Sequence, residues 1–463
     1  MLSKNTIQRT GFRMKEFITL RHGLPYFSVT KESVVVKGAK GAGNLVTEGI
    51  TTSPVLPVCP CCGGKAYSHG TFTRRLWDLP VLGRRHLLIV TGKRYRCTSC
   101  HHMWRQRIGF ASPEHNFTFR LGKRMQTRIN LGGTLTDVSR DFGIHPYVLY
   151  RMDRKYLQEK YGSYSPGRTK LIGIDEFLLH EGHRYATIVT DLERGDVIFV
   201  EEGKKKQQAE DFFRFVGPEW MRNVEAVSMD MNAQYDSAFR EHYPHSAIVY
   251  DYFHLIKLFN DSVLTRIRRR LQREARENGD MERYKVLKGG RFILLSSREK
   301  LRQRDEAAHA NNSELFENYE KKGLSLPPGR RKMFARRCTR LRDMLALNSD
   351  LNVAYFLLEQ LKVAYEVGSE KTMKKGFRLW LRLAGQSSCH EILAFRQTVI
   401  DHLQGILSHA RYSINSGKVE GTNNMVKTIK KQAYGFRDSQ YFFMKILIAS
   451  RLPAYKYKSN RLL

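Results

Sequence analysis

The chain has 463 residues, of which 41% are hydrophobic, so it is long enough for about two to four domains and is not a disordered tail. Its 79 lysines and arginines outnumber its 45 aspartates and glutamates, and the formal net charge of +34 is spread along the whole chain. This balance favours nucleic acid as the partner. A membrane is disfavoured, because the sequence has no apolar run of about 18 residues and no clear signal peptide.

The first segment, residues 1–55, receives no function. Its apolar run Ser33–Lys37 is compatible with a strand, and the sequence GAKGAG at Gly38–Gly43 is typical of a flexible linker. We treat the segment as an N-terminal extension.

Two CxxC turns then define residues 56–112 as a zinc-ribbon-like domain. The segments Thr71–Leu79 and His86–Thr91 read as strands around a turn at Pro80–Arg84, so a long hairpin separates the two turns. Four thiolates from two tight turns can close one tetrahedral structural Zn²⁺ site, and the expected ligands are Cys59, Cys62, Cys97 and Cys100. Cys61, His101 and His102 are alternative ligands, and free or redox-active thiols are the competing interpretation.

Residues 113–165 are predicted to form a helix-turn-helix domain. Within Thr134–Met152, small residues at positions 139 and 143 and apolar residues at core spacing indicate two helices joined by a tight turn. The second helix, about Pro146–Arg154, would enter a major groove and present Tyr147 and Arg151 to the bases. An ordinary helical hairpin is the alternative.

Residues 166–254 carry the clearest fold signal, an order of elements β-β-β-α-β-α-β. Three meandering strands followed by two crossovers predict a mixed five-stranded sheet of the ribonuclease-H type, in which the first and fourth strands are parallel neighbours. The predicted elements are Leu171–Leu179, Tyr185–Thr190, Val197–Glu201, Lys206–Val216, Val224–Met229, Ala233–His242 and Ala247–Tyr250.

The sequence then becomes helical and basic over residues 255–410, which we interpret as a helical insertion in the catalytic domain. Its most basic stretch is Arg266–Arg276, and we expect Arg268, Arg269 and Arg270 to contact DNA phosphates. A solvated helix face is the alternative. Residues 411–463 return to the catalytic domain and contain a predicted helix at Met425–Lys430, with Glu420 at or just before its start.

Three carboxylates are predicted to converge on this topology. Asp175 lies on the first strand, Asp230 ends the fourth, and Glu420 joins them if its helix packs beside these strands. Such a cluster is stable only around cations, and its hard oxygen ligands suit two Mg²⁺ or Mn²⁺ ions that flank one phosphodiester. Lys427, two helical turns after Glu420, would hold the DNA backbone. Glu176 points to the opposite face of the strand and is left out of the site.

Several motifs together resemble a bacterial insertion-sequence transposase of the ISL-three family, from about Cys59 to Leu452. The resemblance implies a DDE triad at Asp175, Asp230 and Glu420 that cuts and joins DNA at transposon ends. It also implies that Asp251 and His254 form a D-x-x-H pair near the metals. The motifs are CPCCG (Cys59–Gly63), RLWDLP (Arg75–Pro80), RYRCTSC (Arg94–Cys100), LIGIDEF (Leu171–Phe177), VSMDMNAQY (Val227–Tyr235), YDYFHLIK (Tyr250–Lys257) and SGKVEGTNNMVKTIKKQAYGFRD (Ser416–Asp438).

The sequence as a whole therefore predicts a metal-dependent DDE transposase. Its partners would be double-stranded DNA, as transposon ends and as target, and at least one further copy of the chain, since two ends must be held together. Cysteine usage indicates a reducing cytosol. The resemblance implies that this is a bacterial cytoplasm and that the protein is associated with the nucleoid. The alternatives are a structure-specific metal-dependent nuclease and a non-catalytic zinc-containing DNA-binding regulator.

Overall fold

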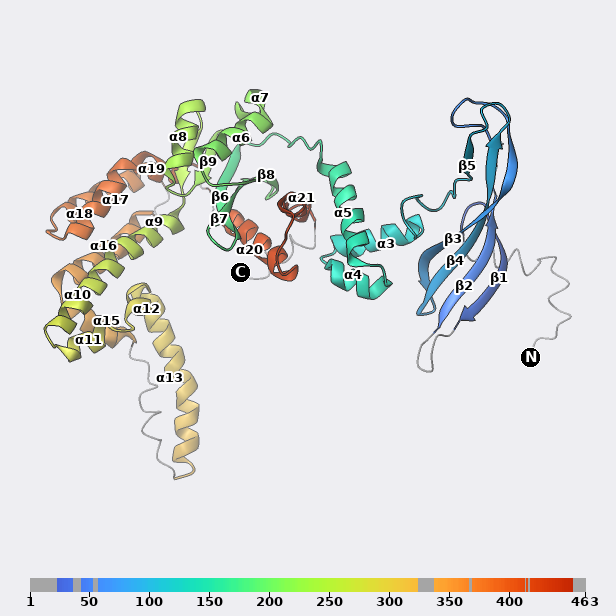
Figure 1. Cartoon of the computed structure of the whole chain (residues 1–463). Helices are drawn as coiled ribbons and strands as arrows, with labels where there is room; N and C mark the ends of the chain where they lie inside the picture. The colour runs from blue at the N-terminus through green and yellow to red at the C-terminus, as the bar shows by residue number, and fades with distance from the viewer. Residues whose placement is uncertain are drawn as a thin grey trace. The chain divides into compact units, whose positions relative to one another are not determined.

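The computed structural model describes residues 23–35, 43–52, 57–323, 337–365, 369–412, 414 and 417–452. The chain divides into two compact units (Figure 1). The N-terminal unit comprises Met1–Gly162, Lys431–Phe436 and Leu452–Leu463, and the C-terminal unit comprises Ser163–Lys430 and Arg437–Arg451. No helix within the described ranges has the length and apolarity needed to cross a membrane.

The N-terminal unit is built on one five-stranded sheet. Its order is β1-β2-β4-β3, with β5 (Met103–Arg105) paired to β4 (Arg84–Cys97). The segment left unassigned by the sequence supplies β1 (Phe27–Val35) and β2 (Asn44–Thr51), and β2 runs parallel to β4. The N-terminal extension is thus part of the same sheet as the zinc segment. Most of the predicted Gly38–Gly43 linker, and Lys37, lie outside the described residues.

The predicted hairpin is present and longer than expected. β3 (Ala66–Val81) and β4 pair antiparallel around a two-residue turn at Leu82 and Gly83, with register shifts near Ser68 and Asp78. Alternating side chains of both strands are buried, among them Leu76, Leu88 and Val90. β3 begins five residues before the predicted start at Thr71, mostly through exposed residues, and β4 continues six residues beyond the predicted end at Thr91.

Over the described residues of the N-terminal unit, the sheet is followed by three helices: α3 (Phe119–Asn130), α4 (Leu135–Phe142) and α5 (Pro146–Tyr161). A capping box between Thr134 and Asp137 starts α4, and Gly143, in the left-handed region at φ 66°, ends it. Pro146 occupies the first turn of α5, as predicted, and this helix continues seven residues beyond the predicted Arg154. The three helices pack against Trp77 and Leu79 of β3.

The C-terminal unit contains a second five-stranded sheet of order β10-β9-β6-β7-β8. The three strands β6, β7 and β8 are antiparallel, and β9 and β10 add parallel to β6. All five predicted strands are present and the first and fourth are parallel neighbours, as expected; their bounds are β6 (Leu171–His180), β7 (Arg184–Asp191), β8 (Val197–Glu202), β9 (Ala226–Met229) and β10 (Ala247–Tyr250).

Helices lie on both faces of this sheet, as the alternation along β6 shows. Ile172 and Ile174 join the core with α6 (Lys206–Val216), α7 (Pro218–Met221) and α8 (Ala233–His242). Residues 173, 175 and 177 face α20 (Gly417–Gln432) and α21 (Ser439–Ala449) instead. β6 is therefore covered on both sides, which explains its nearly continuous apolar sequence.

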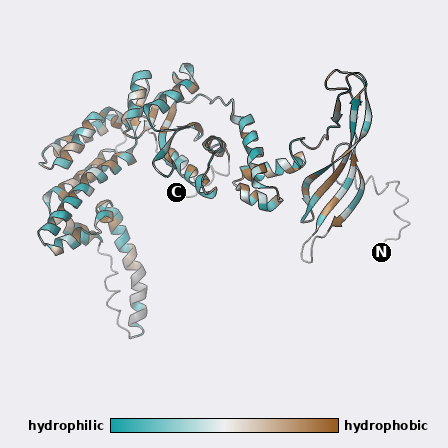
Figure 2. Ribbon diagram, in the orientation of Figure 1, coloured by the Kyte–Doolittle hydropathy of each residue, from teal (hydrophilic) through white to brown (hydrophobic). Residues whose placement is uncertain are grey.

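The remainder of the C-terminal unit is helical, as predicted for the insertion. Apolar residues follow the buried sides of these helices and polar residues the outer sides (Figure 2). The predicted core segments Leu357–Val363 and Phe377–Leu383 lie inside α16 and α17, which are joined by a 2.8 Å hydrogen bond from the Trp380 indole to the carbonyl of Leu357. The helices are α9 (Tyr252–Phe259), the π-helical turn η2 (Asn260–Leu264), α10 (Thr265–Glu277), α11 (Met281–Leu287), α12 (Arg291–Leu294), α13 (Arg298–Glu320), α15 (Arg337–Ala346), α16 (Ser349–Tyr365), α17 (Glu370–Gly385), α18 (His390–Asp401) and α19 (Leu403–Tyr412).

Candidate functional site

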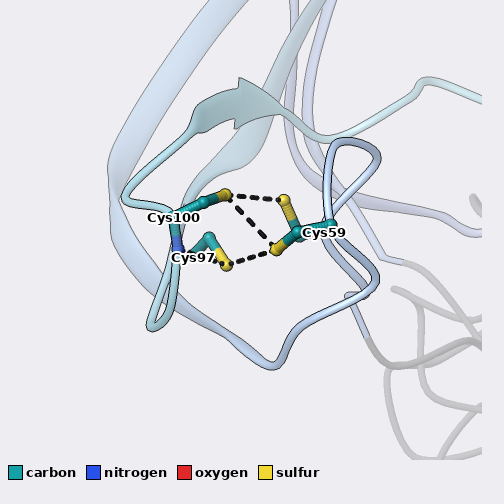
Figure 3. A group of neighbouring side chains, drawn as sticks. Cys59, Cys97 and Cys100 are labelled. Atoms are coloured by element: carbon teal, nitrogen blue, oxygen red, sulfur yellow. Dashed lines mark hydrogen bonds between the residues drawn. The ribbon is translucent and has the colours of Figure 1, made fainter.

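The two CxxC turns bring four sulfur atoms together at one end of the β3–β4 hairpin (Figure 3). Sγ–Sγ distances are 3.5 Å for Cys59–Cys100, 3.5 Å for Cys62–Cys97 and 3.3 Å for Cys62–Cys100. Tetrahedral zinc with Zn–S bonds of about 2.3 Å would hold its sulfurs about 3.8 Å apart, which is within about 0.5 Å of the three distances observed. The arrangement fits one zinc ion.

Backbone N–H groups point at these sulfurs. They come from Cys61 to Cys59 at 3.4 Å and from Ser99 to Cys97 at 3.3 Å. The N–H of Cys100, together with that of Ser99, lowers the pKa of Cys97 to about 6 despite desolvation. Hydrogen bonds with neighbouring thiols, led by Cys62, raise the pKa of Cys100 to about 12 against the opposing N–H of His102. Ionising Cys62 and Cys100 as well as Cys97 places like charges side by side, and a bound cation would offset their repulsion.

The alternative zinc ligands do not join this group. Among the described residues, the four sulfurs within 4.8 Å of one another belong to the two CxxC pairs alone. Cys61 is exposed in its turn, His101 is exposed, and His102 stacks against Trp104 with ring centroids 6.0 Å apart.

Helix α5 offers an exposed face that suits DNA. Leu149, Asp153 and Leu157 point into the unit, and Tyr147 and Arg151 lie on the opposite, solvent-facing side. Tyr147 is 61% exposed. The sequence-based placement of these two side chains on one accessible face is therefore consistent with the structure.

The basic stretch of α10 requires a revision. Arg268 is buried and donates to the carbonyl of Leu287 at 3.1 Å, and Arg270 pairs with Asp350 at 3.1 Å and with Glu391 at 3.3 Å. Arg268 is held inside the helical region, and Arg270, although its side chain is 33% exposed, is paired with acidic side chains. Of the three arginines of α10 predicted to contact phosphates, Arg269 is the one that is exposed; it shares its face with Arg266, Arg273 and Arg276.

Two of the predicted catalytic carboxylates lie next to each other at the edge where β6 and β9 run parallel. Asp175 is 9% exposed on β6, and Asp230 follows the last residue of β9. Burial, and then the charge of Asp230, raise the pKa of Asp175 to about 6. Burying a carboxylate beside another carboxylate is unfavourable without a compensating cation.

The D-x-x-H pair lies at the same place. His254 Nδ1 is 2.5 Å from an oxygen of Asp230 and 3.0 Å from one of Asp251, and these three residues form the second group of metal-ligating atoms among the described residues. Asp251 caps the N-terminus of α9 and so fixes His254 one turn later. Burial opposes protonation of His254, but hydrogen bonds to Asp230 and Asp251 outweigh it and raise its pKa to about 10.

Glu420 lies in the first turn of α20, which begins at Gly417, so it is inside the helix and not before it. It is exposed and does not belong to the group formed by Asp230, Asp251 and His254. One turn further along the helix, Asn423 donates to Asp175 at 2.5 Å. Helix α20, which carries both Glu420 and Asn423, therefore lies on the side of β6 to which the Asp175 side chain points. Lys427 is exposed on the same helix.

Asn423 is the residue that the sequence reasoning missed. Its Nδ2 atom contacts Asp175, and its Oδ1 atom is buried without a hydrogen-bond partner among the described residues. Its position three residues after Glu420 was the available signal. Glu176 was left out of the site because it was predicted to point to the opposite face of β6 from Asp175. This is confirmed, since Glu176 accepts hydrogen bonds from Asn232 at 3.2 Å and from Tyr235 at 3.4 Å on the side of α8.

Comparison with known proteins agrees with this geometry. Residues 172–446 match the DDE transposase family of the ISL3 (ISL-three) group, described as "Transposase", and residues 56–100 match the "zinc-finger of transposase IS204/IS1001/IS1096/IS1165". The chain is 28% identical over 393 residues to the transposase for insertion sequence element IS1001 of Bordetella parapertussis, covering 85% of this chain and 88% of that protein. It is 24% identical over 287 residues to the transposase for IS1557 of Mycobacterium tuberculosis, covering 58% and 57% of the two chains. The matched family covers more than half of the sequence, and the chain therefore belongs to the ISL3 family of insertion-sequence transposases.

Proposed function

We propose that this chain binds the terminal inverted repeats of its insertion sequence, cleaves the DNA strand at the element end and transfers that end to target DNA. The observation that supports catalysis most directly is the buried Asp175 beside Asp230, with the unpartnered Oδ1 of Asn423 next to it. The strand order around this site is that of a ribonuclease-H-like domain, which supports the same assignment.

The donor set fits divalent cations of the Mg²⁺ or Mn²⁺ type. Its carboxylates are hard oxygen ligands, and the Oδ1 atom of Asn423, buried without a hydrogen-bond partner among the described residues, adds an amide oxygen beside Asp175. Asp175, Asp230 and Glu420 would hold the ions, with Asn423 as an additional ligand. Such ions, when bound, activate the attacking oxygen and stabilise the leaving oxygen in an in-line displacement on the phosphodiester.

The remaining residues position these groups. Asn423 holds one oxygen of Asp175, and the backbone N–H of Glu176 holds the other at 2.7 Å, so this carboxylate is fixed before substrate arrives. Although burial opposes protonation of His254, its contacts with Asp230 at 2.5 Å and Asp251 at 3.0 Å raise its pKa, and these contacts orient both carboxylates. We infer that His254 supports the carboxylates as a positioning residue and takes no part as a base.

DNA binding is proposed to be shared among three surfaces. The zinc ribbon and α5, through Tyr147 and Arg151, would recognise the element end. Arg269 with its exposed neighbours on α10, and Lys427 on α20, would contact phosphates. Since two ends must be brought together for transposition, we propose that the active form is at least a dimer.

A strand-transfer assay with a labelled element end tests this function. Asp175→Ala, Asp230→Ala and Glu420→Ala should each abolish cleavage and joining and leave end binding nearly intact, because the three carboxylates serve the metals. Near-normal cleavage by any one variant removes that residue from the site. Cleavage without joining by the wild-type protein would make it a nuclease, and binding without cleavage would make it a regulator.

A further inference from the structure

At the tip of the β3–β4 hairpin, Leu82 combines an unfavourable backbone conformation with an exposed apolar side chain. Leu82 and Gly83 form the two-residue turn with φ values of 48° and 73°. A turn with both φ values positive favours Asn-Gly or Asp-Gly, and a leucine is strained there. The Leu82 side chain is also 94% exposed. Neither the backbone conformation nor the solvated apolar side chain benefits the fold, which is typical of a residue kept for an interaction.

The tip is attached to the helix pair of the same unit. Arg85, two residues past the turn, donates to the carbonyl of Gly143 at 3.0 Å, and its guanidinium stacks 3.9 Å from the centre of the Trp77 ring. Trp77 in turn packs against the core formed by α3, α4 and α5. Gly143 precedes α5 by only two residues, so the hairpin tip and the N-terminus of the proposed recognition helix are held as one surface.

The charge and shape of this surface fit DNA. Arg84 and Arg85 follow the tip, and Tyr147 and Arg151 are exposed on α5. A helix seated in a major groove leaves the neighbouring minor groove open to an adjacent loop, and exposed leucines serve as wedges between base pairs in minor-groove binders. We propose that Leu82 enters the minor groove of the element end, beside the major groove contacted by α5, and unstacks one base step there. This inference rests on the proposed recognition of the element end.

Leu82→Asn is the decisive variant, because asparagine suits the turn better than leucine and removes the wedge. The full-length protein would be titrated with duplexes of the element end that carry 2-aminopurine at successive adenines, whose fluorescence rises on unstacking. The wild-type protein should produce this rise at one step. Leu82→Asn should abolish it and weaken binding of the true end by about tenfold, with unchanged or higher thermal stability. Leu82→Met, which keeps an apolar side chain, should retain the signal.

Ile50→Thr is the matched control, since Ile50 is 45% exposed on β2, outside the zinc ribbon and α5, and pairs with Thr91 of β4, roughly 25 Å along the strand from the tip at about 3.3 Å per residue. It should leave the fluorescence change intact. If the fluorescence rise seen with the wild-type protein persists in Leu82→Asn, the proposal that Leu82 unstacks a base step is wrong. It is also wrong if Leu82→Asn loses self-association in the absence of DNA, because the tip would then contact a second copy of the chain. Failure of the wild-type protein to distinguish the element end from scrambled DNA would instead refute the proposed function.

Discussion

Replacing Asp175 with asparagine should stabilise the metal-free protein while it abolishes catalysis. The folded state raises the pKa of Asp175 from 3.8 to about 6, because the carboxyl is buried beside Asp230. Between these values the folded chain binds more protons than the unfolded chain, so the free energy of unfolding falls as the pH rises through this window. At about 1.4 kcal/mol per pKa unit, the penalty above pH 6 is at most about 3 kcal/mol.

Asparagine removes this penalty and preserves the local contacts. Its Oδ1 atom can accept the N–H of Glu176, as the carboxylate does at 2.7 Å. Its amide N–H₂ can donate to Asn423 after that side chain turns over, which would also give the buried Oδ1 of Asn423 a partner. The variant should therefore gain up to about 3 kcal/mol at pH 7.5, and about half of that at pH 5, where Asp175 is largely protonated in the folded state.

Thermal unfolding in buffer freed of Mg²⁺ and Mn²⁺, with zinc retained, measures this difference. A gain of this size should raise the midpoint by at most about 6 to 12 °C at pH 7.5. Asp191→Asn is the control and should lower the midpoint, because it removes the buried carboxylate charge that pairs with the Arg194 guanidinium at 3.3 Å. If Asp175→Asn were no more stable than wild type at either pH, the buried Asp175 carboxylate would not destabilise the metal-free protein, and our inference that it requires a cation would be wrong.

Other predictions concern zinc and DNA. Freshly reduced protein should contain about one zinc ion per chain by metal analysis, and Cys97→Ser should lose it while Cys61→Ser keeps it; zinc-free wild-type protein would contradict the site. Binding should weaken by about 10³-fold between 50 and 200 mM salt if six or more phosphates are contacted, and a flat titration would exclude that mode. Arg269→Ala should lower affinity for matched and scrambled ends alike, whereas Arg151→Ala should reduce discrimination between them. An equal loss for both sequences with Arg151→Ala would leave specificity to the zinc ribbon.

The sheet of the C-terminal unit and the zinc site follow from local sequence patterns. Strand lengths and the β-β-β-α-β-α-β order predict that β6 and β9 are neighbours, and this places Asp175 beside Asp230 without further information. The CxxC spacing fixes each pair of sulfurs in a tight turn, and the pairing of β3 with β4 then brings the two turns together. In both cases the contacts depend on regular hydrogen bonding, which periodicity encodes.

Contacts made by individual side chains across long distances in the chain were not predictable. Besides Glu274 on the same helix, the acidic partners of Arg270 lie 80 and 121 residues away, and the sequence around this arginine does not indicate those two contacts. The parallel pairing of β2 with β4 is likewise set by packing, since β2 carries no signal for its neighbour. Asn423 was missed for the same reason: its role depends on where α20 meets β6, not on the helix itself.

The seating of α20 on β6 shows how far net charge can overstate a DNA-binding surface. Lys418 donates to the carbonyls of Leu192 and Glu193 at 2.6 and 2.8 Å, and twelve residues later Lys430 donates to the carbonyl of Leu178 at 3.0 Å. These two lysines hold the helix at points about 18 Å apart along its axis, with Asn423 between them. These contacts fix the position of α20 along β6 and thereby place Asn423 against Asp175. Arg268 and Arg270 likewise make contacts within the helical region. The basic side chains that remain available to DNA phosphates are those on exposed faces. We therefore expect the salt dependence of binding to reflect the number of these side chains and not the total charge of +34.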